Sequence, residues 1–284
     1  NGWFVLRSNI KPGVTKGAVK WIITPNVVAD WMYQPVIQTS QIGYHPAQDK
    51  EAVIEMDIRD NRKETAQIIR IDADGEKVVK NVTPANWGKF LRYNYLKVNF
   101  TDVKEPGLYK IKYNTSVSPI FRIDNDVYAR GVWQPVLEYF LPVQMCHMRV
   151  NEKYRVWHDC CHMDDAQMAP AHNHIDGYDQ KEGLSKFKPG EVVPGVNIGG
   201  WHDAGDFDLR IESQAGESYI LALAYEAFHP NLDVTSIDQI NRVTEIHQPD
   251  GKNDLLQQVE NGALTVVNGY LALGRLYRGI ICND

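Results

Sequence analysis

The sequence lacks the features that would direct a protein into a membrane or onto a nucleic acid. It has no apolar run approaching the roughly 18 consecutive residues that a membrane-spanning helix needs. Its formal net charge of −6 at pH 7 argues against a nucleic-acid partner, because a phosphate backbone selects for basic patches. Residues 1–4 show neither the basic start nor the long apolar stretch of a signal peptide, which is uninformative if the chain is trimmed. The chain starts without an initiator methionine, and we therefore expect a mature or trimmed protein.

Length and composition are typical of a globular protein with one large domain or two ordinary ones. The chain has 284 residues, of which 43% are hydrophobic and 23% are charged. Aromatic residues make up 10% and include seven Trp, although buried Trp usually belong to the core. A neutral, hydroxyl-rich ligand such as a polysaccharide suits both the charge and this aromatic content.

Residues 36–123 are predicted to form a small β-sandwich. Apolar and polar residues alternate in short runs, as in residues 52–58 and 108–113, and turn residues separate these runs. Such strands, spaced about 10 residues apart, are the pattern of a sandwich. For residues 1–35 two possibilities stay open, namely extra strands or an extended lead-in.

After residue 124 the pattern changes to helical spacing. Apolar residues at this spacing predict three helices, over residues 127–147, 208–228 and 253–277. Pro135 and Pro142 indicate kinks or a break in the first of them. Residues 148–200 are rich in Gly, Pro, His and Asp and predict a long irregular loop, which inside a compact domain is usually functional. This order of elements indicates the beginning of an all-α domain.

The segment Asp203-Ala204-Gly205-Asp206 places two carboxylates three residues apart. If the segment turns sharply, as Gly205 permits, both carboxylates can hold one water molecule, and one of them can take its proton. A structural role is also open, because Asp206 could be the N-cap of a helix that begins near Asp208.

Cysteine and histidine are concentrated in one part of the chain. Three of the four cysteines, Cys146, Cys160 and Cys161, fall within 16 residues, and Cys282 lies apart. Adjacent cysteines are hard to bridge to each other, so a metal site has equal weight with a disulfide frame. Six of the nine histidines fall in the same region. They are His147, His158, His162, His172, His174 and His202.

Four segments carry a resemblance to glycoside hydrolase family 9, whose members are mostly cellulases. Residues 199–207, GGWHDAGDF, are similar to the catalytic signature of that family. Residues 41–46 (QIGYHP) and 100–109 (FTDVKEPGLY) resemble the opening strand and the late turn and strand of the immunoglobulin-like module that precedes many of its barrels. Residues 121–128 (FRIDNDVY) resemble the junction into the barrel.

The resemblance implies a multidomain β + α fold. An Ig-like β-sandwich is expected at residues 36–125, after the lead-in segment 1–35. The first part of an (α/α)6 catalytic barrel is expected at residues 126–284. The matches follow the family's order over about residues 36–284, and the chain looks truncated within the barrel.

The resemblance also implies an activity, the hydrolysis of β-1,4-glucosidic bonds with inversion. By match of motif, Asp206 is the general base and Asp203 positions the attacking water. An inverting enzyme also needs a general acid, and in this family it is a Glu far towards the C-terminus of the barrel, which no segment here matches. We therefore expect an endo-β-1,4-glucanase of cellulase type whose missing C-terminal half is required, so that this fragment alone is inactive.

The family's two-Cys, two-His zinc site corresponds here to Cys146, Cys161, His162 and His202. Four protein ligands make a closed, structural Zn²⁺ site. Cys160 is the nearest competitor for a ligand position, and free or disulfide-bonded cysteines remain the competing interpretation. Among further ions, Ca²⁺ is an expectation for the full catalytic domain.

Sugar rings stack on aromatic faces, so Trp157, Tyr178 and Trp201 are candidate substrate contacts, with core packing at least as favoured for each. The departures from the family pattern at residues 208–210, 257–258 and 261 indicate a divergent subgroup that could act on a branched or mixed-linkage glucan. Two competing functions stay open: an exo-acting glucosidase or glucosaminidase of the same family, and a non-catalytic carbohydrate-binding protein. The substrate class implies a secreted, periplasmic or cell-surface location.

Overall fold

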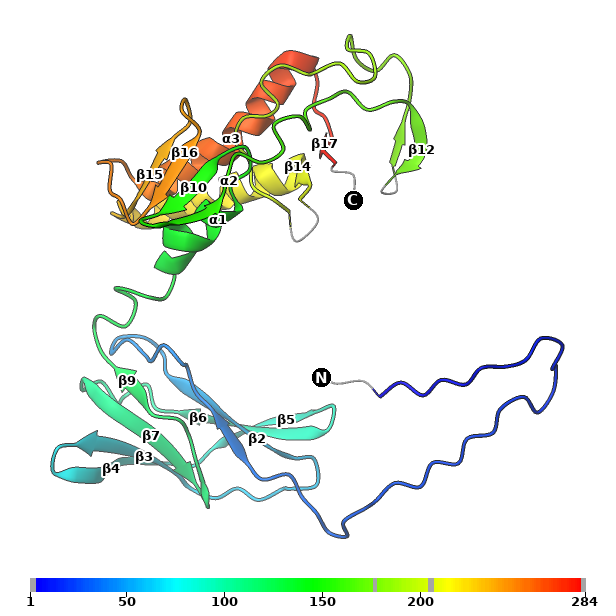
Figure 1. Ribbon diagram of the computed structural model, residues 1–284. Coiled ribbons are helices and arrows are strands. Elements are labelled where there is room, and N and C mark those ends of the chain that lie inside the picture. Colours follow the sequence, from blue (N-terminus) through cyan, green and yellow to red (C-terminus); the bar gives the residue numbers. More distant parts are fainter. Residues whose placement is uncertain (1–3, 176–177, 204–206, 282–284) are drawn as a thin grey trace. The chain divides into compact units, whose positions relative to one another are not determined.

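The computed structural model describes residues 4–175, 178–203 and 207–281. The chain divides into two compact units, Asn1–Asn125 and Asp126–Asp284 (Figure 1). Residues 4–35 form no strand, so extra strands are not realised over those residues. None of the helices formed by the described residues combines the length and hydropathy that crossing a membrane requires.

The first unit is a β-sandwich of two antiparallel sheets (Figure 1). One sheet has the strand order β1 (Val36–Gln38), β2 (Glu51–Asp57), β6 (Tyr93–Asn99) and β5 (Ala85–Phe90). The other has the order β4 (Gly75–Val82), β3 (Ala66–Asp72), β7 (Gly107–Tyr113) and β8 (Ser116–Val117), and β9 (Phe121–Ile123) also pairs with β7.

The alternation of apolar residues in these strands explains how the sheets face each other. In β6, Asn94, Leu96 and Val98 point inward and are buried, while the residues between them are partly exposed. Side chains from both sheets, among them Ile54 and Ile111, form one buried cluster. The sandwich predicted from the sequence is therefore present.

A buried lysine stabilises the loop between β1 and β2. The Lys50 side chain is fully buried, and its Nζ donates to the carbonyl oxygens of Pro46 at 2.8 Å and Gln48 at 2.9 Å. Burial lowers the pKa of Lys50. The ammonium group thus satisfies carbonyls that strand pairing leaves free.

The second unit combines two long helices with a mixed sheet. Helices α2 (Ile211–Phe228) and α3 (Asp254–Leu273) pack against each other. The sheet has the order β11 (Arg155–His158), β10 (Arg149–Glu152), β16 (Val243–Ile246) and β15 (Thr235–Asp238), with β10 and β16 parallel. Shorter elements are η1 (Val136–Phe140), α1 (Leu141–Gln144) and two small ladders, β12 (His172–Ile175) with β13 (Tyr178–Gln180) and β14 (Leu209–Arg210) with β17 (Gly279–Ile280).

The second unit differs from the predicted helical pattern in three places. The helix expected over residues 127–147 is reduced to the π-helical turn η1 followed by α1, because Pro142 is tolerated only in the first turn of a helix. The region 148–200 contains β10, β11, β12 and β13, and is not the structureless loop that was expected. The hairpin of β15 and β16 lies between the two long helices in the chain, so the described elements do not by themselves define part of an (α/α)6 barrel.

Candidate metal centre and catalytic turn

Two cysteines and two histidines from three segments meet in the second unit. The ligand atoms of Cys146, Cys161, His162 and His202 all lie within 4.8 Å of one another, and this group is called the metal cluster below. The Cys146 and Cys161 sulfurs are 3.7 Å apart, and Cys146 Sγ lies 3.4 Å from His162 Nδ1. Cys161 Sγ lies 3.4 Å from His202 Nε2. These are the four residues that the sequence predicts as ligands, and together they could hold a metal ion.

Backbone pairing brings the segments of the cluster together. Cys146 N–H donates to the Gly200 carbonyl at 3.0 Å, and His202 N–H donates to the Gln144 carbonyl at 2.8 Å. Residues 144–146 and 200–202 therefore run side by side in antiparallel register. Cys161 and His162 lie in the segment that follows β11, and the backbone of His162 is in the left-handed region with a φ angle of 52°.

The charge state of the cysteines favours a cation. A hydrogen bond to Cys161, reinforced by burial, raises the pKa of the Cys146 thiol far above its usual range. The same bond lowers the pKa of Cys161 far below its usual range, with further hydrogen bonds from His158 and His202. The two thiols are thus coupled, and a metal ion that bound both sulfurs would release any proton that they retain.

Cys160, the competitor for a ligand position, lies outside this arrangement. Its sulfur is 3.8 Å from the Arg242 carbonyl oxygen, and it does not belong to the metal cluster. The cysteines of the described residues, Cys146, Cys160 and Cys161, are free thiols. Cys282 lies outside the described residues.

The turn that leads to Asp203 needs two glycines. Gly199 and Gly200 adopt φ angles of 74° and 89°, which side chains with a Cβ rarely take. A Cβ on Gly199 would lie 2.3 Å from the Asn261 carbonyl oxygen, and one on Gly200 would lie 2.6 Å from Leu209. A side chain at position 199 would meet the backbone of α3. A side chain at position 200 would require both a strained positive φ angle and a shift of the Leu209 side chain.

Polar residues of the two long helices bind the same turn. Asn261 of α3 accepts from Gly200 N–H with its backbone carbonyl at 2.9 Å and donates from Nδ2 to the Gly200 carbonyl at 3.1 Å. The Gln214 side chain of α2 accepts from Trp201 N–H at 2.9 Å and donates to the Trp201 carbonyl at 3.0 Å. In the sequence, Asn261 stands out only as a departure from the family pattern, and Gln214 does not stand out at all. Their roles depend on contacts that only the fold creates.

Asp203 stands at the end of this turn, next to His202 of the metal cluster. Its backbone N–H donates to the Asp208 carbonyl at 2.7 Å, and its carboxylate lies 3.5 Å from Arg210 Nε. The Asp203 side chain is 33% exposed, so water can reach it. Burial, and then the charge of Asp203, raises the pKa of Glu217 on α2. Asp203 is thus an accessible carboxylate held by backbone and by an ion pair.

The second predicted catalytic residue, Asp206, lies outside the described residues. A capping role for Asp206 in a helix beginning near Asp208 does not match the helix start. Helix α2 begins at Ile211, and its N-cap position is Arg210, whose side chain makes no capping hydrogen bond.

The three aromatic candidates for substrate binding differ in accessibility. Trp201 is 1% exposed and lies in the core, where its Nε1–H donates to Gln258 at 2.8 Å, so its ring cannot stack on a sugar. Trp157 is partly buried, with the Arg155 guanidinium 4.5 Å from its ring centroid and Tyr139 edge-on at 5.0 Å. Tyr178 lies in β13, and its side chain is outside the described part of the chain.

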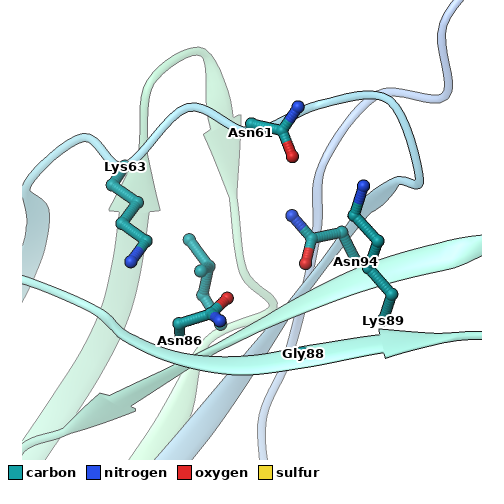
Figure 2. Close-up of a pocket in the computed structure, with 7 residues that line it drawn as sticks. Asn61, Lys63, Asn86, Gly88, Lys89 and Asn94 are labelled. Carbon is teal, nitrogen blue, oxygen red and sulfur yellow. The ribbon is translucent and has the colours of Figure 1, made fainter.

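A pocket of about 210 Å³ lies in the first unit (Figure 2). Amide and ammonium groups dominate its wall, and no carboxylate is among the residues that line it. Such a wall cannot supply the paired carboxyl groups of glycoside hydrolysis. The lining residues are Asn61, Lys63, Asn86, Gly88, Lys89, Asn94 and Leu96.

Residues 32–118 match the family described as the cellulase N-terminal ig-like domain. No curated protein sequence matches the chain. Among solved structures, a metagenome-derived glycoside hydrolase family 9 endoglucanase is 24% identical, with a TM-score of 0.61 over 86% of this chain and 42% of that one. Bacteroides ovatus GH9 is 20% identical, with a TM-score of 0.57 over 86% and 41%. A Zn-binding triple mutant of GH family 9 endoglucanase J30 is 23% identical, with a TM-score of 0.54 over 79% and 38%.

These matches show which proteins the chain resembles in sequence and in fold. The first unit is a cellulase-type N-terminal Ig-like domain, and most of the chain shares the fold of family 9 endoglucanases. The resemblance predicted from the sequence motifs is therefore confirmed. The chain spans about two fifths of the length of the solved structures that it matches.

Proposed function

We propose that this chain is part of a family 9 glycoside hydrolase that cleaves β-1,4-glucosidic bonds in cellulose or a related β-glucan with inversion. The observation that carries the proposal is the similarity in fold to family 9 endoglucanases over 86% of the chain. The cellulase-type Ig-like domain at residues 32–118 supports it independently.

In this proposal Asp206 is the general base and Asp203 positions the attacking water. The geometry of Asp203 supports the second role, since its carboxylate is accessible and is held beside Arg210. A carboxylate held in this way can accept a hydrogen bond from the attacking water.

By the family resemblance, we expect the general acid to be a Glu far towards the C-terminus of the barrel, which no segment of this chain matches. Inversion requires acid and base about 6.5–9.5 Å apart, so that the water fits between base and sugar. In this proposal the present chain contributes the general base and the water-positioning carboxylate. The remaining part of the barrel is needed to supply the general acid.

The metal cluster fits Zn²⁺. In a tetrahedron with Zn–S bonds of about 2.3 Å and Zn–N bonds of about 2.0–2.1 Å, two sulfurs lie about 3.8 Å apart, and a sulfur and a nitrogen lie about 3.5 Å apart. The corresponding separations here are 3.7, 3.4 and 3.4 Å. The Zn-binding variant among the similar structures supports the same ion.

With four protein ligands, the ion would be structural. It would tie His202, and with it Asp203, to the end of α1 and to the segment after β11. Ca²⁺ in the full catalytic domain stays a prediction from the family resemblance, as does a secreted, periplasmic or cell-surface location.

A change of Asp206 to Asn in the full-length protein tests the proposal. Loss of the general base is expected to lower kcat on a soluble β-glucan about 10²–10⁴-fold. The matched control is Glu226→Gln, which neutralises an exposed carboxylate on α2. Inversion predicts an α-configured product by NMR. Unchanged turnover in the Asp206 variant would refute the assignment of the base.

Two outcomes of the same assays would favour the competing functions. Release of single sugars from one chain end of a labelled oligosaccharide would indicate an exo-acting glucosidase or glucosaminidase. Binding of cello-oligosaccharides without any hydrolysis by the full-length protein would indicate a carbohydrate-binding protein.

A further inference from the structure

His147 is completely buried next to the metal cluster, yet it is not a member of it. Its Nδ1 lies 3.2 Å from the Gly199 carbonyl oxygen, and its Nε2 lies 3.2 Å from Asp165 Oδ1. A carbonyl oxygen can only accept, so Nδ1 carries a proton and donates to Gly199. The ring therefore joins the first residue of the Gly199–Asp203 turn to the segment that follows His162 in the chain.

The Asp165 carboxylate relies on this contact with the His147 ring. Its Oδ2 is buried and lacks a hydrogen-bond partner within the part of the chain that the structure describes. Its backbone N–H points to the carbonyl of the metal-cluster residue His162 at 3.4 Å. A buried carboxyl group in this position depends on His147, because leaving it unpaired costs free energy.

The backbone of His147 faces the cluster as well. Its φ angle of 62° lies in the left-handed region. In this conformation its backbone N–H donates toward the sulfurs of Cys146 and Cys161. The His147 carbonyl accepts from Arg242 Nη1 at 3.3 Å, and the same nitrogen donates to the Asn197 carbonyl at 2.8 Å. One residue thus contacts the sulfurs, the following loop and the turn.

We propose that His147 and Asp165 form a buried clamp that positions the metal cluster and couples it to the Gly199–Asp203 turn. Cys146, His147 and Asp165 also lie within 4.8 Å of one another. Even so, His147 acts as a positioning residue and not as a ligand, because Nδ1 is committed to Gly199 and Nε2 to Asp165. The coupling to catalysis rests on the proposed function, whereas the coupling to the metal cluster does not.

Two substitutions separate the contacts of the clamp. In His147→Asn, the amide nitrogen can replace Nδ1 as donor to Gly199, and Asn tolerates a positive φ, but the contact with Asp165 is lost. Asp165→Asn keeps the shape of the side chain and replaces one carboxyl oxygen with an NH2 group, which cannot accept a hydrogen bond. His229→Asn is the matched control, because His229 is an exposed residue with a φ angle of 45° at the end of α2.

The test uses the full-length protein and Zn²⁺ itself, in competition with a chelator. Both clamp variants are expected to bind Zn²⁺ about 10–100-fold more weakly than the wild type, the range typical of groups that support metal ligands. The double variant is expected to lose little more than either single variant, because the two residues act as one unit. The control should bind Zn²⁺ like the wild type.

Hydrogen exchange in the zinc-loaded proteins tests the link to the turn. The amides of Gly200 and His202, which donate to Asn261 and Gln144, are expected to exchange at least several-fold faster in both clamp variants than in the wild type and the control. The proposal is overturned if the clamp variants keep wild-type Zn²⁺ affinity and exchange. It is also overturned if the protein binds no Zn²⁺, or if a second equivalent of Zn²⁺ depends on His147. Neither measurement uses a glucan, so failure of the proposed hydrolysis would be recognised separately.

Discussion

Replacing Cys161 by serine removes a side chain that contacts both a sulfur and an imidazole of the metal cluster. Cys161 Sγ lies 3.7 Å from Cys146 Sγ and 3.4 Å from His202 Nε2, and the pKa of this thiol is lowered. A serine hydroxyl does not ionise near neutral pH and is a poor ligand for Zn²⁺ compared with a thiolate. Cys160→Ser changes the neighbouring residue in the same chemical way but outside the cluster, and it is therefore the matched control.

The expected effect on stability follows from mass action. Zinc at a free concentration about 1,000 times its dissociation constant stabilises the folded state by about 4.1 kcal/mol. For a unit of the size of Asp126–Asp284, about 2–4 °C per kcal/mol converts this into a difference of roughly 8–16 °C in Tm. Cys161→Ser should lose most of this difference, whereas Cys160→Ser should keep it.

Elemental analysis and calorimetry with and without a chelator provide the assay. The wild type and Cys160→Ser are expected to carry one zinc per chain and to lose thermal stability when it is removed. Only the transition of the second unit should shift, because the first unit contains none of the four ligands. The reasoning is refuted if Cys161→Ser retains a full equivalent of zinc, or if Cys160→Ser loses as much metal as Cys161→Ser.

Three further changes test the packing around the site and in the sandwich. Burial raises the pKa of Asp254 to about 6, so stability is lost as pH rises through that value. As the pH falls from 7 to 5, the free energy of unfolding in urea should therefore rise for the wild type relative to Asp254→Asn. An equal pH dependence of the two proteins would contradict this. Gly199→Ala should cost more than about 1 kcal/mol and weaken zinc binding, since its Cβ would meet the Asn261 carbonyl at 2.3 Å. Lys50→Met should destabilise the first unit by about 1–3 kcal/mol in urea titrations by leaving buried carbonyls unpaired; an unchanged midpoint would contradict this.

Local sequence patterns are sufficient to predict the β-sandwich and the two long helices. Alternation with a period of two marks strands such as β7, and helical spacing with the cap residue Asn253 marks α3. The hairpin of β15 and β16 is not predicted because its strands have only four residues each, too few to show a pattern. The first predicted helix is wrong because its apolar spacing continues through prolines that a helix interior does not accept.

For the site, the sequence shows which chemical groups are present but not which residues they contact in the fold. Cys161 and His162 are adjacent, and a concentration of Cys and His is visible in the sequence. The hydrogen bonds of Gln214 and Asn261 to the turn join residues 13 and 61 positions apart. Such contacts depend on how α2 and α3 pack, and no local pattern encodes this. The same is true of His147, whose type alone suggests a surface residue.

The short distance between the Cys146 and Cys161 sulfurs makes the state of the purified protein depend on whether it meets a metal ion or an oxidant first. With a metal ion bound, both thiolates are occupied and unreactive. Without it, the Cys161 thiolate and the Cys146 thiol stand 3.7 Å apart, and an oxidant such as oxidised glutathione can join them. A chain that meets the oxidant before the metal would then be closed to the metal. The order in which a preparation encounters air and zinc would decide which form is isolated.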